Sequence, residues 1–279
     1  GLSPHLIWLL VFYFTAYAST YSQGWEQTFG NPPTAMGREG IQTSDGGYIF
    51  TGDPGGGGTG PTVKTDYLGN AEWTIPHAGT SIQQTFDGGY IIAGGSNNGF
   101  LKKIDEMGNL TWTRYYGNTS VQDIASYVEQ TLDSGYIVCG ALYINGTQGL
   151  DYFLVKTDVN GDTLWSRTYG GSGSDWANEV HQTTDGGFVL VGRRNSSGGV
   201  IKTDAMGNLE WETNFTPYGD QSIQQTFDGG YIVAGYNLTK LNSSGQEIWV
   251  NNISGTLHSV KQTFDGGYVC AGGFGINES

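Results

Sequence analysis

A short sequence that recurs six times constrains the fold of this chain more than any other feature. It reads Gln-Thr-x-Asp-Gly-Gly-Tyr-Ile in close variants, one with Ser for the first Gly and one with Phe for Tyr. Its Asp residues are spaced by 37 to 52 residues and are Asp45, Asp87, Asp133, Asp185, Asp228 and Asp265. A second sequence, Lys-Thr-Asp-x-x-Gly-Asn-x-x-Trp in close variants, follows the first five copies and ends at Trp73, Trp112, Trp165, Trp211 and Trp249. The chain is therefore a series of similar units.

Each unit reads as four short strands. In the second unit these strands are predicted at 81–86, 90–94, 100–105 and 110–113. Asp-Gly between apolar strand residues favours a hairpin turn in which both central residues take positive φ. The x-x-Gly-Asn sequence favours a second turn in which Gly is left-handed. Four strands in about 45 residues are typical of a propeller blade, so the sequence predicts an all-β fold: a six-bladed β-propeller of four-stranded blades over residues 24–279.

The two ends of this region are expected to share the sixth blade. Only 14 residues follow Asp265, which leaves no room for a Trp strand. Residues 24–30 supply the missing pattern, because Trp-x-x-Thr-aromatic-Gly begins at Trp25 as it does at Trp165. We expect this N-terminal strand to close the ring and to leave no sheet edge exposed.

The two motifs together resemble those of secreted and cell-surface β-propeller repeat proteins of archaea and bacteria. The resemblance covers roughly residues 24–279. It implies a propeller that lies outside the cytoplasm, at the cell surface. It indicates little about activity, because propellers carry many unrelated functions.

The charge balance narrows the range of partners. The chain has 26 acidic and 12 basic side chains, which gives a net charge of -14. A protein that binds the phosphate backbone needs a positive face, so no nucleic-acid partner is expected. Disorder is also excluded, because 37 aromatic residues recur at regular places.

Residues 1–23 form a separate apolar segment, predicted to act in assembly or anchoring. Its uncharged core is too short to span a bilayer comfortably. We expect a retained assembly segment, with an uncleaved secretory signal and a membrane anchor as alternatives. The core consists of Leu6, Ile7, Trp8, Leu9, Leu10, Val11, Phe12, Tyr13 and Phe14.

The start of this segment, Gly-Leu-Ser-Pro before the apolar run, resembles the processing site of archaeal type IV pilins and archaellins. The resemblance implies cleavage near Gly1 and a helix packed in a filament core. Ser3 and Pro4 suit the N-cap and the first helical position. The aromatic residues equally suit an extended segment that is donated as a strand to a neighbouring subunit. Helix and donated strand therefore both stay open.

Nine Asn-x-Ser/Thr sequences predict N-linked glycans. Chance would give roughly three, and the alternative is that a surface rich in Asn, Ser and Thr produces them by accident. Glycans would add bulk and hydration to a surface that is poor in Lys. The nine are Asn109, Asn118, Asn145, Asn195, Asn214, Asn237, Asn242, Asn252 and Asn277.

Residues of catalytic or metal-binding type form no familiar constellation. The four His have no metal-like spacing, and nucleophile elbows, Cys-x-x-Cys and phosphate loops are missing. Asp158-Val-Asn-Gly-Asp162 is similar to the start of a calcium loop but is expected to be an ordinary turn. Cys139 and Cys270 fall in opposite predicted blades, so we expect two buried thiols. We therefore expect no metal, no cofactor and no enzymatic activity.

Thr-x-Asp-Gly-Gly-Tyr is similar to the Asp boxes of sialidase propellers, where the motif is structural. A sialidase also needs an arginine cluster, and this chain has only Arg38, Arg114, Arg167, Arg193 and Arg194.

Three sets of repeated residues call for a role. The glutamines either form a ring around the central channel, able to hold water or a small polar ligand, or satisfy turn backbone groups. They are Gln42, Gln84, Gln130, Gln182, Gln225 and Gln262. The lysines Lys64, Lys103, Lys156, Lys202 and Lys240 are expected to form surface pairs with nearby carboxylates, such as Asp66 beside Lys64. The Trp series is expected in the core or between blades.

The function most consistent with these features is structural. We expect an extracellular, glycosylated subunit that forms a homopolymer through residues 1–23, as a pilus-like filament or surface layer. The alternative is a monomeric or membrane-tethered surface module that binds carbohydrate or protein on its propeller face. A glycoside-acting enzyme is the third hypothesis, and it requires two acidic residues across a pocket.

Overall fold

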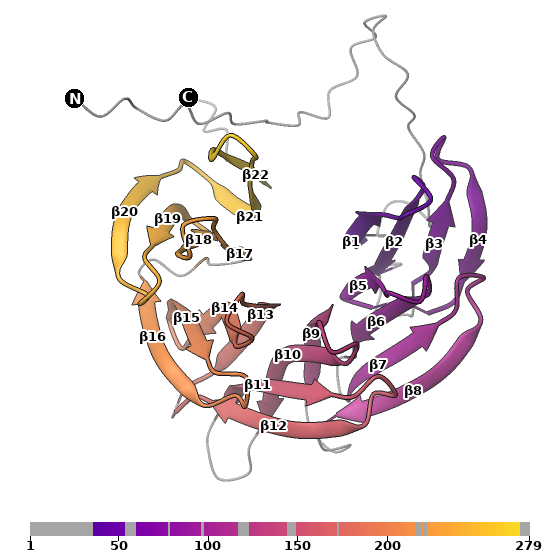
Figure 1. Ribbon diagram of the computed structural model, residues 1–279, viewed down its shortest axis with the longest axis horizontal. Coiled ribbons are helices and arrows are strands. Elements are labelled where there is room, and N and C mark those ends of the chain that lie inside the picture. The colour runs from indigo at the N-terminus through magenta and orange to yellow at the C-terminus, as the bar shows by residue number, and fades with distance from the viewer. Residues whose placement is uncertain are drawn as a thin grey trace, which may run out of the picture. The chain divides into compact units, whose positions relative to one another are not determined.

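The computed structural model describes residues 36–53, 60–77, 79–95, 98–116, 123–143, 149–171, 173–215, 219 and 222–273. Within these ranges the regular structure consists of 22 strands, and Figure 1 shows them as successive sheets along the chain. Five sheets have four strands and one has two. The predicted all-β fold of four-stranded repeats is thus confirmed. The predicted closing strand, residues 24–30, lies outside the described residues, as do residues 1–23 and 274–279.

Each sheet is built from consecutive strands that are hydrogen-bonded in chain order. The first sheet contains β1 (Met36–Gln42), β2 (Tyr48–Asp53), β3 (Thr62–Thr65) and β4 (Ala71–Ile75). The second contains β5 (Ser81–Gln84), β6 (Tyr90–Gly94), β7 (Gly99–Ile104) and β8 (Leu110–Tyr116). The third contains β9 (Ile124–Gln130), β10 (Tyr136–Tyr143), β11 (Leu150–Thr157) and β12 (Thr163–Tyr169).

The later sheets repeat this plan. The fourth contains β13 (Asp175–Gln182), β14 (Phe188–Arg194), β15 (Ser197–Thr203) and β16 (Leu209–Phe215). The fifth contains β17 (Ser222–Gln225), β18 (Tyr231–Ala234), β19 (Asn237–Leu241) and β20 (Glu247–Asn252). The sixth contains β21 (Thr256–Gln262) and β22 (Tyr268–Gly273).

The described residues divide into two compact units. One holds residues up to 143 together with 155–165, and the other holds 149–154 together with 166–273. Within both units the pairs are antiparallel, and the motif Gln always faces the motif aromatic residue. Gln84 is opposite Tyr90 in the first unit, and Gln225 is opposite Tyr231 in the second. The repeated sequence therefore sets the same register in successive sheets.

The turn between the first two strands differs from the predicted hairpin. In the second sheet Gly88 N donates to Thr85 O at 2.9 Å, and Thr85 N donates to Gly89 O at 2.8 Å. Only Gly88 has positive φ, at 85°, so the prediction that both central residues are left-handed is wrong. Phe86 and Asp87 form the body of the turn, and the left-handed residue follows them. Residues 85–89 thus form a five-residue loop between β5 and β6. Only one of its two glycines takes a left-handed conformation that favours a residue without Cβ.

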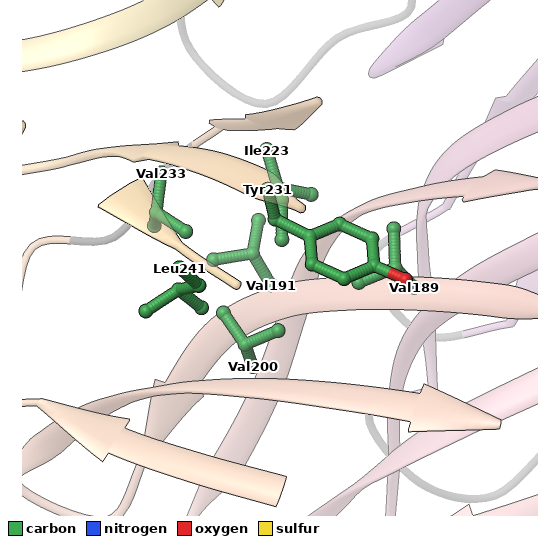
Figure 2. Close-up of a cluster of buried hydrophobic side chains, with 7 residues drawn as sticks. All are labelled: Val189, Val191, Val200, Ile223, Tyr231, Val233 and Leu241. Carbon is green, nitrogen blue, oxygen red and sulfur yellow. The ribbon is translucent and has the colours of Figure 1, made fainter. Parts of the chain in front are cut away.

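The core lies between neighbouring sheets. Figure 2 shows one such cluster, to which Val189 and Val191 of β14 and Val200 of β15 contribute from the fourth sheet. Ile223, Tyr231, Val233 and Leu241 contribute from the fifth sheet. All seven are at most 2% exposed, and burial of such a side chain contributes about 1.5–3 kcal/mol. Packing of one sheet face against the next is the way in which each repeat buries its apolar strands.

Candidate functional site

The motif glutamines lie at the ends of first strands and bind turns. Gln84 Oε1 accepts a hydrogen bond from Ser44 N, 2.7 Å away in the preceding sheet, and its Nε2 donates to Gly88 O in its own turn at 3.3 Å. The same intersheet bond, at 2.7–2.9 Å, joins Gln130 to Phe86, Gln225 to Thr184 and Gln262 to Phe227. Gln130 and Gln262 also donate to their own turns, so three of the four amides satisfy backbone groups of two turns. The interpretation as a ring open to a channel is therefore wrong for them, and the turn-binding alternative holds.

The motif lysines are buried, contrary to the predicted surface pairing. Lys202 is 2% exposed, and its Nζ lies 2.8 Å from Asp185 Oδ2 and 2.9 Å from Glu210 Oε2. Lys202 Nζ also donates to Thr203 O at 2.9 Å. The partner is thus the Asp of the first motif, and not the Asp that follows each Lys closely in the chain. Equivalent pairs, at 2.8–3.0 Å, are Lys64–Asp45, Lys103–Asp87, Lys156–Asp133 and Lys240–Asp228.

These pairs shift the ionisation of the first-motif carboxylates. The hydrogen bond from Lys64, followed by that from Thr43, lowers the pKa of Asp45 to about 2. For Asp185, burial raises the pKa, but bonds from Lys202, Thr183 and Gly187 outweigh it and leave the pKa at about 2. The first-motif carboxylates therefore stay ionised at neutral pH, and their bonds to the lysines hold the first turn against the third strand.

The second-motif carboxylates have a different, local role. Asp105 Oδ1 accepts hydrogen bonds from Met107 N at 3.0 Å and from Asn109 N at 2.8 Å, inside its own turn. Asp158, at the calcium-like sequence, accepts from Asn160 N and Asp162 N in the same way, both at 2.9 Å. The prediction of an ordinary turn at Asp158 is thus confirmed. In the described part of the chain, no group of three or more His, Cys, Asp or Glu side chains is placed to hold a metal ion.

Four of the five motif Trp residues pack against the next sheet, as predicted. Trp211 of β16 meets Tyr231 of β18 edge to face, with ring centroids 5.5 Å apart. Gly245 lies over the same indole, because a Cβ placed there would be 2.4 Å from the Trp211 ring. Matching contacts join Trp73 to Tyr90, Trp112 to Tyr136 and Trp249 to Tyr268. The Trp of one repeat therefore packs against the first-motif aromatic residue and the second turn of the next repeat.

Six of the nine predicted glycosylation residues lie in the described part of the chain. Asn109, Asn195, Asn214 and Asn252 are exposed, whereas Asn237 and Asn242 are half-buried. Asn109 Nδ2 donates to Asp105 Oδ2 at 2.9 Å, so the second turn gives this Asn a role of its own. Asn118, Asn145 and Asn277 fall outside the described residues, as does the predicted assembly segment Leu6–Phe14.

The predicted burial of Cys139 and Cys270 is confirmed. Burial raises the pKa of the Cys270 thiol. His181 lies with its Nε2 3.0 Å from Glu179 Oε1, and Glu179 Oε2 accepts a bond from Ile223 N at 2.7 Å. The His181–Glu179 pair on β13 therefore links the fourth sheet to β17 of the fifth sheet.

One edge of the sheets exposes large apolar side chains that the sequence analysis did not single out. We call it the turn edge. It is the end of the strands, and not an outer strand, at which both motif turns of each four-stranded sheet lie. Phe86, Phe227 and Phe264, between Thr and Asp of the first motif, are 67%, 72% and 104% exposed. Leu132 occupies the same position and is 83% exposed. The second turns add Tyr67, Leu68, Met107, Val159 and Met206. In the sequence, the recurrence of Phe and Leu between Thr and Asp of the first motif is the pattern that indicates this surface.

A cavity of about 280 Å³ lies at the opposite edge of the fourth sheet, lined by Gly170, Asp175, Arg194, Asn195 and further residues. Asp175 Oδ1 accepts a bond from Asn195 N at 2.7 Å, and Arg194 forms an ion pair with Glu212. Asn195 has a φ of 55°, a value uncommon outside Gly.

A second buried carboxyl group lies against this cavity. Asp151 is 6% exposed, its Oδ1 has no hydrogen-bond partner, and a Cβ added to Gly170 would be 2.2 Å from that atom. Burial and the charge of Asp175 raise the pKa of Asp151, whereas the Gly171 amide and Arg194 oppose the rise. The cavity wall therefore presents the Asp175 carboxylate, the Arg194 guanidinium and glycine backbone, and the Asp151 carboxyl group lies directly behind Gly170. That set suits a small polar ligand, and a pair of neighbouring carboxyl groups is also the arrangement that acid–base chemistry uses.

Comparison with known proteins identifies the fold only. No family model matches the chain, and no curated protein matches it. Among solved structures, the Dos1 propeller is 12% identical with a TM-score of 0.56, over 86% of this chain and 76% of that one. BamB from Moraxella catarrhalis is 17% identical with a TM-score of 0.50, over 78% of this chain and 64% of BamB. A candidate gluconolactonase is 11% identical with a TM-score of 0.51, over 83% of this chain and 86% of that one.

The class that this fold defines is that of the β-propeller repeat proteins. At such low identities the likeness carries no activity over to this chain. No helix long and apolar enough to cross a membrane occurs in the part of the chain that the structure describes.

Proposed function

We propose that this protein is an extracellular, glycosylated structural subunit that assembles with copies of itself into a pilus-like filament or surface layer. The observation that carries the proposal is the use of the repeated polar residues. Gln, Lys and Asp of the motifs bind one another and neighbouring turns, as Lys202 does with Asp185. A repeat whose reactive side chains all serve its own architecture fits a building block better than a catalyst.

The assembly element in this proposal is residues 1–23. Nine uncharged residues, Leu6–Phe14, would be poorly solvated on an acidic protein, so they need an apolar environment. A contact of this segment with a neighbouring copy is heterologous, and such contacts build open filaments. Secretion to the cell surface follows from the resemblance of the repeats to secreted propellers, and the exposed Asn195, Asn214 and Asn252 are open to glycans.

The outer domain is proposed to be a six-bladed ring in which residues 24–30 complete the sixth sheet. In the described repeats the Trp precedes the next first strand by 7 to 12 residues, and Trp25 precedes β1 by 11. In the described residues the sixth sheet has only two strands, and no lysine pairs with Asp265. Both facts are expected if strands from the two chain ends complete this sheet.

Negative-stain electron microscopy of the native protein and of a variant lacking residues 1–23 tests the proposal. Filaments or sheets from the full chain and single rings from the shortened chain are the expected result. Single particles from both would leave a surface binding module as the function.

That module is the second candidate, and the cavity at Asp151, Asp175 and Arg194 favours it. Carbohydrate is the ligand class that its mixed donors and acceptors suit. Calorimetric titration with neutral oligosaccharides tests it, with Asp175→Asn as the variant that should abolish binding. Hydrolytic activity, which would require both carboxyl groups, would appear as slow turnover of the same sugars and disappear in Asp151→Asn.

A further inference from the structure

The turn edge exposes its large apolar residues at a position where the fold does not require them. The residue between Thr and Asp of the first motif contributes its backbone amide to the intersheet bond. Phe86 N donates to Gln130 Oε1 at 2.7 Å and Phe227 N to Gln262 Oε1 at 2.8 Å. Ser44 and Thr184, whose own side chains are polar, donate the same backbone bond to a Gln at 2.7 and 2.9 Å. The intersheet bond therefore depends on the backbone amide and not on the side chain. Phe in place of Ser at this position adds exposed apolar surface only.

Within each unit the exposed side chains repeat from sheet to sheet at the turn edge. Phe86 and Leu132 lie on the second and third sheets of one unit, and Phe227 and Phe264 on the fifth and sixth sheets of the other. Their exposures of 67% to 104% are high for such residues. Clusters of exposed apolar side chains on a soluble protein mark interaction sites.

The same edge is hollowed beside Phe227. A cavity of about 490 Å³ is lined there by Phe227, Ile248, Trp249 and Tyr268, among others. In earlier repeats the glycine turn of the next sheet fills the matching place, as Gly245 does over Trp211. In the sixth sheet the matching second-turn residues lie outside the described part of the chain. The wall of the hollow is mainly apolar and aromatic, with Asp228 and Lys240 also on it, and its volume would admit one or two aromatic side chains.

The negative charges of the first-motif Asp residues at the turn edge are partly neutralised by lysines of the same sheets. Asp87, Asp133 and Asp228 each pair with a buried lysine of the same sheet. An anionic lipid surface would still be repelled by a chain with net charge -14. An uncharged apolar segment suffers no such repulsion, and this chain itself carries one, Leu6–Phe14.

We propose that the turn edge is the acceptor surface for Leu6–Phe14 of a second copy of this chain. The inference rests on the proposed self-assembly and names the surface that it uses. Four of the nine segment residues are aromatic and match the aromatic hollow beside Phe227. Nine residues separate Phe14 from Gly24, and they span at most about 30 Å when extended, enough to reach a neighbouring copy.

The first experiment compares two triple variants of the full chain. Phe86→Ser, Phe227→Ser and Phe264→Ser together remove aromatic surface from the turn edge, and Ser44 shows that the turn accepts Ser. The matched control is Tyr115→Ser, Tyr143→Ser and Tyr236→Ser. Tyr115 and Tyr143 lie at the strand ends away from the turn edge, Tyr236 lies in the link between β18 and β19, and all three are exposed. We expect the turn-edge variant to polymerise at least about tenfold more weakly in sedimentation, and the control to polymerise like the native protein.

The second experiment separates donor from acceptor. The turn-edge triple variant keeps its segment and is a donor, whereas the native chain lacking residues 1–23 is an acceptor. At a concentration at which the native protein polymerises and the turn-edge variant does not, each alone should sediment as a monomer, and an equimolar mixture should form a one-to-one complex. Circular dichroism of each protein checks that it is folded.

The outcomes distinguish the inference from the proposed function. If removal of residues 1–23 abolishes polymers but the turn-edge variant still polymerises, the acceptor surface is elsewhere and the inference fails while self-assembly stands. If the native protein is monomeric at all concentrations, both fail. A mixture of donor and acceptor that forms no complex also overturns the inference.

Discussion

Lys202 Nζ and Asp185 Oδ2 lie 2.8 Å apart and join the two motifs of the fourth repeat. The lysine is buried on β15, and the carboxylate, 56% exposed at its side chain, belongs to the turn before β14. The bond explains why a charged residue recurs on an otherwise apolar third strand. It also gives the first Asp a role in architecture rather than in ligand binding.

Replacement of Asp185 by Asn should destabilise the protein, because among the described residues it leaves buried Lys202 with Glu210 alone as a carboxylate partner. The exposed position of Asp185 reduces the loss to about 1–2 kcal/mol, below the range for fully buried pairs. Asp265→Asn is the control, since no lysine is paired with Asp265 in the described residues. Urea denaturation should show equal midpoints for the control and the native protein, and equal losses in both variants would refute the role of the pair.

Stability should fall in acid as the first-motif carboxylates are protonated. Their folded pKa values of about 2 at Asp45, Asp185 and Asp228 lie below the ordinary value of 3.8. Their contribution is therefore complete above about pH 4 and is lost as the pH falls from there to about 2. Thermal melting between pH 6 and 2 measures it. The Asp185→Asn variant should lose less stability over that interval than the native protein does.

Gly245→Ala should be more damaging than Gly229→Ala. Both glycines have φ of 78°, so both variants carry the left-handed strain of about 1 kcal/mol. At Gly245 the new Cβ would also be 2.4 Å from the Trp211 ring, whereas Gly229 has nothing within 4 Å. We expect an additional loss of about 1–3 kcal/mol at Gly245, as in overpacked cores. Equal melting temperatures would show that the Trp211 ring can shift to make room for the new Cβ without a loss of stability.

Trp25→Ala tests the proposed closing strand. If residues 24–30 complete the sixth sheet, this variant should lose stability as Trp211→Ala does, by about 3 kcal/mol or more. Trp8→Ala is the control, because Trp8 belongs to the proposed assembly segment and not to the ring. Denaturation is best measured on chains diluted below the concentration at which they polymerise. A Trp25→Ala variant as stable as the control would place the closing strand elsewhere.

Asp151→Asn should stabilise the protein at pH 7. Burial and the charge of Asp175 raise the pKa of Asp151, so its ionised form is disfavoured in the folded state. A raised folded pKa means that stability is lost as the pH rises through the ordinary value of 3.8 toward the folded one. The gain from the substitution should therefore be present at pH 7 and absent at pH 3. A loss at pH 7 would mean that the charged carboxylate is bound by a group near the cavity.

The strands and the turns of this protein could be predicted from sequence because they depend on neighbours in the chain. The second turn is formed by Asp105, Gly108 and Asn109, which lie within five residues of one another. The first turn was predicted in place but not in form, because Asp-Gly suits more than one hairpin and only one of its glycines is left-handed. The Trp series could be placed between sheets because its spacing follows the repeat.

The sequence by itself determined the repeat, the all-β class and the position of each turn, since local backbone preferences and a fixed period need no distant partner. Only the tertiary structure decided that Lys202 is buried on Asp185, that Gln84 holds Ser44 of the preceding sheet, and that Phe86 is exposed. Such contacts join residues 17 and 40 positions apart, and one motif position allows both Ser and Phe. Burial and pairing depend on which sheet face lies against which, and side-chain identity alone does not contain that information.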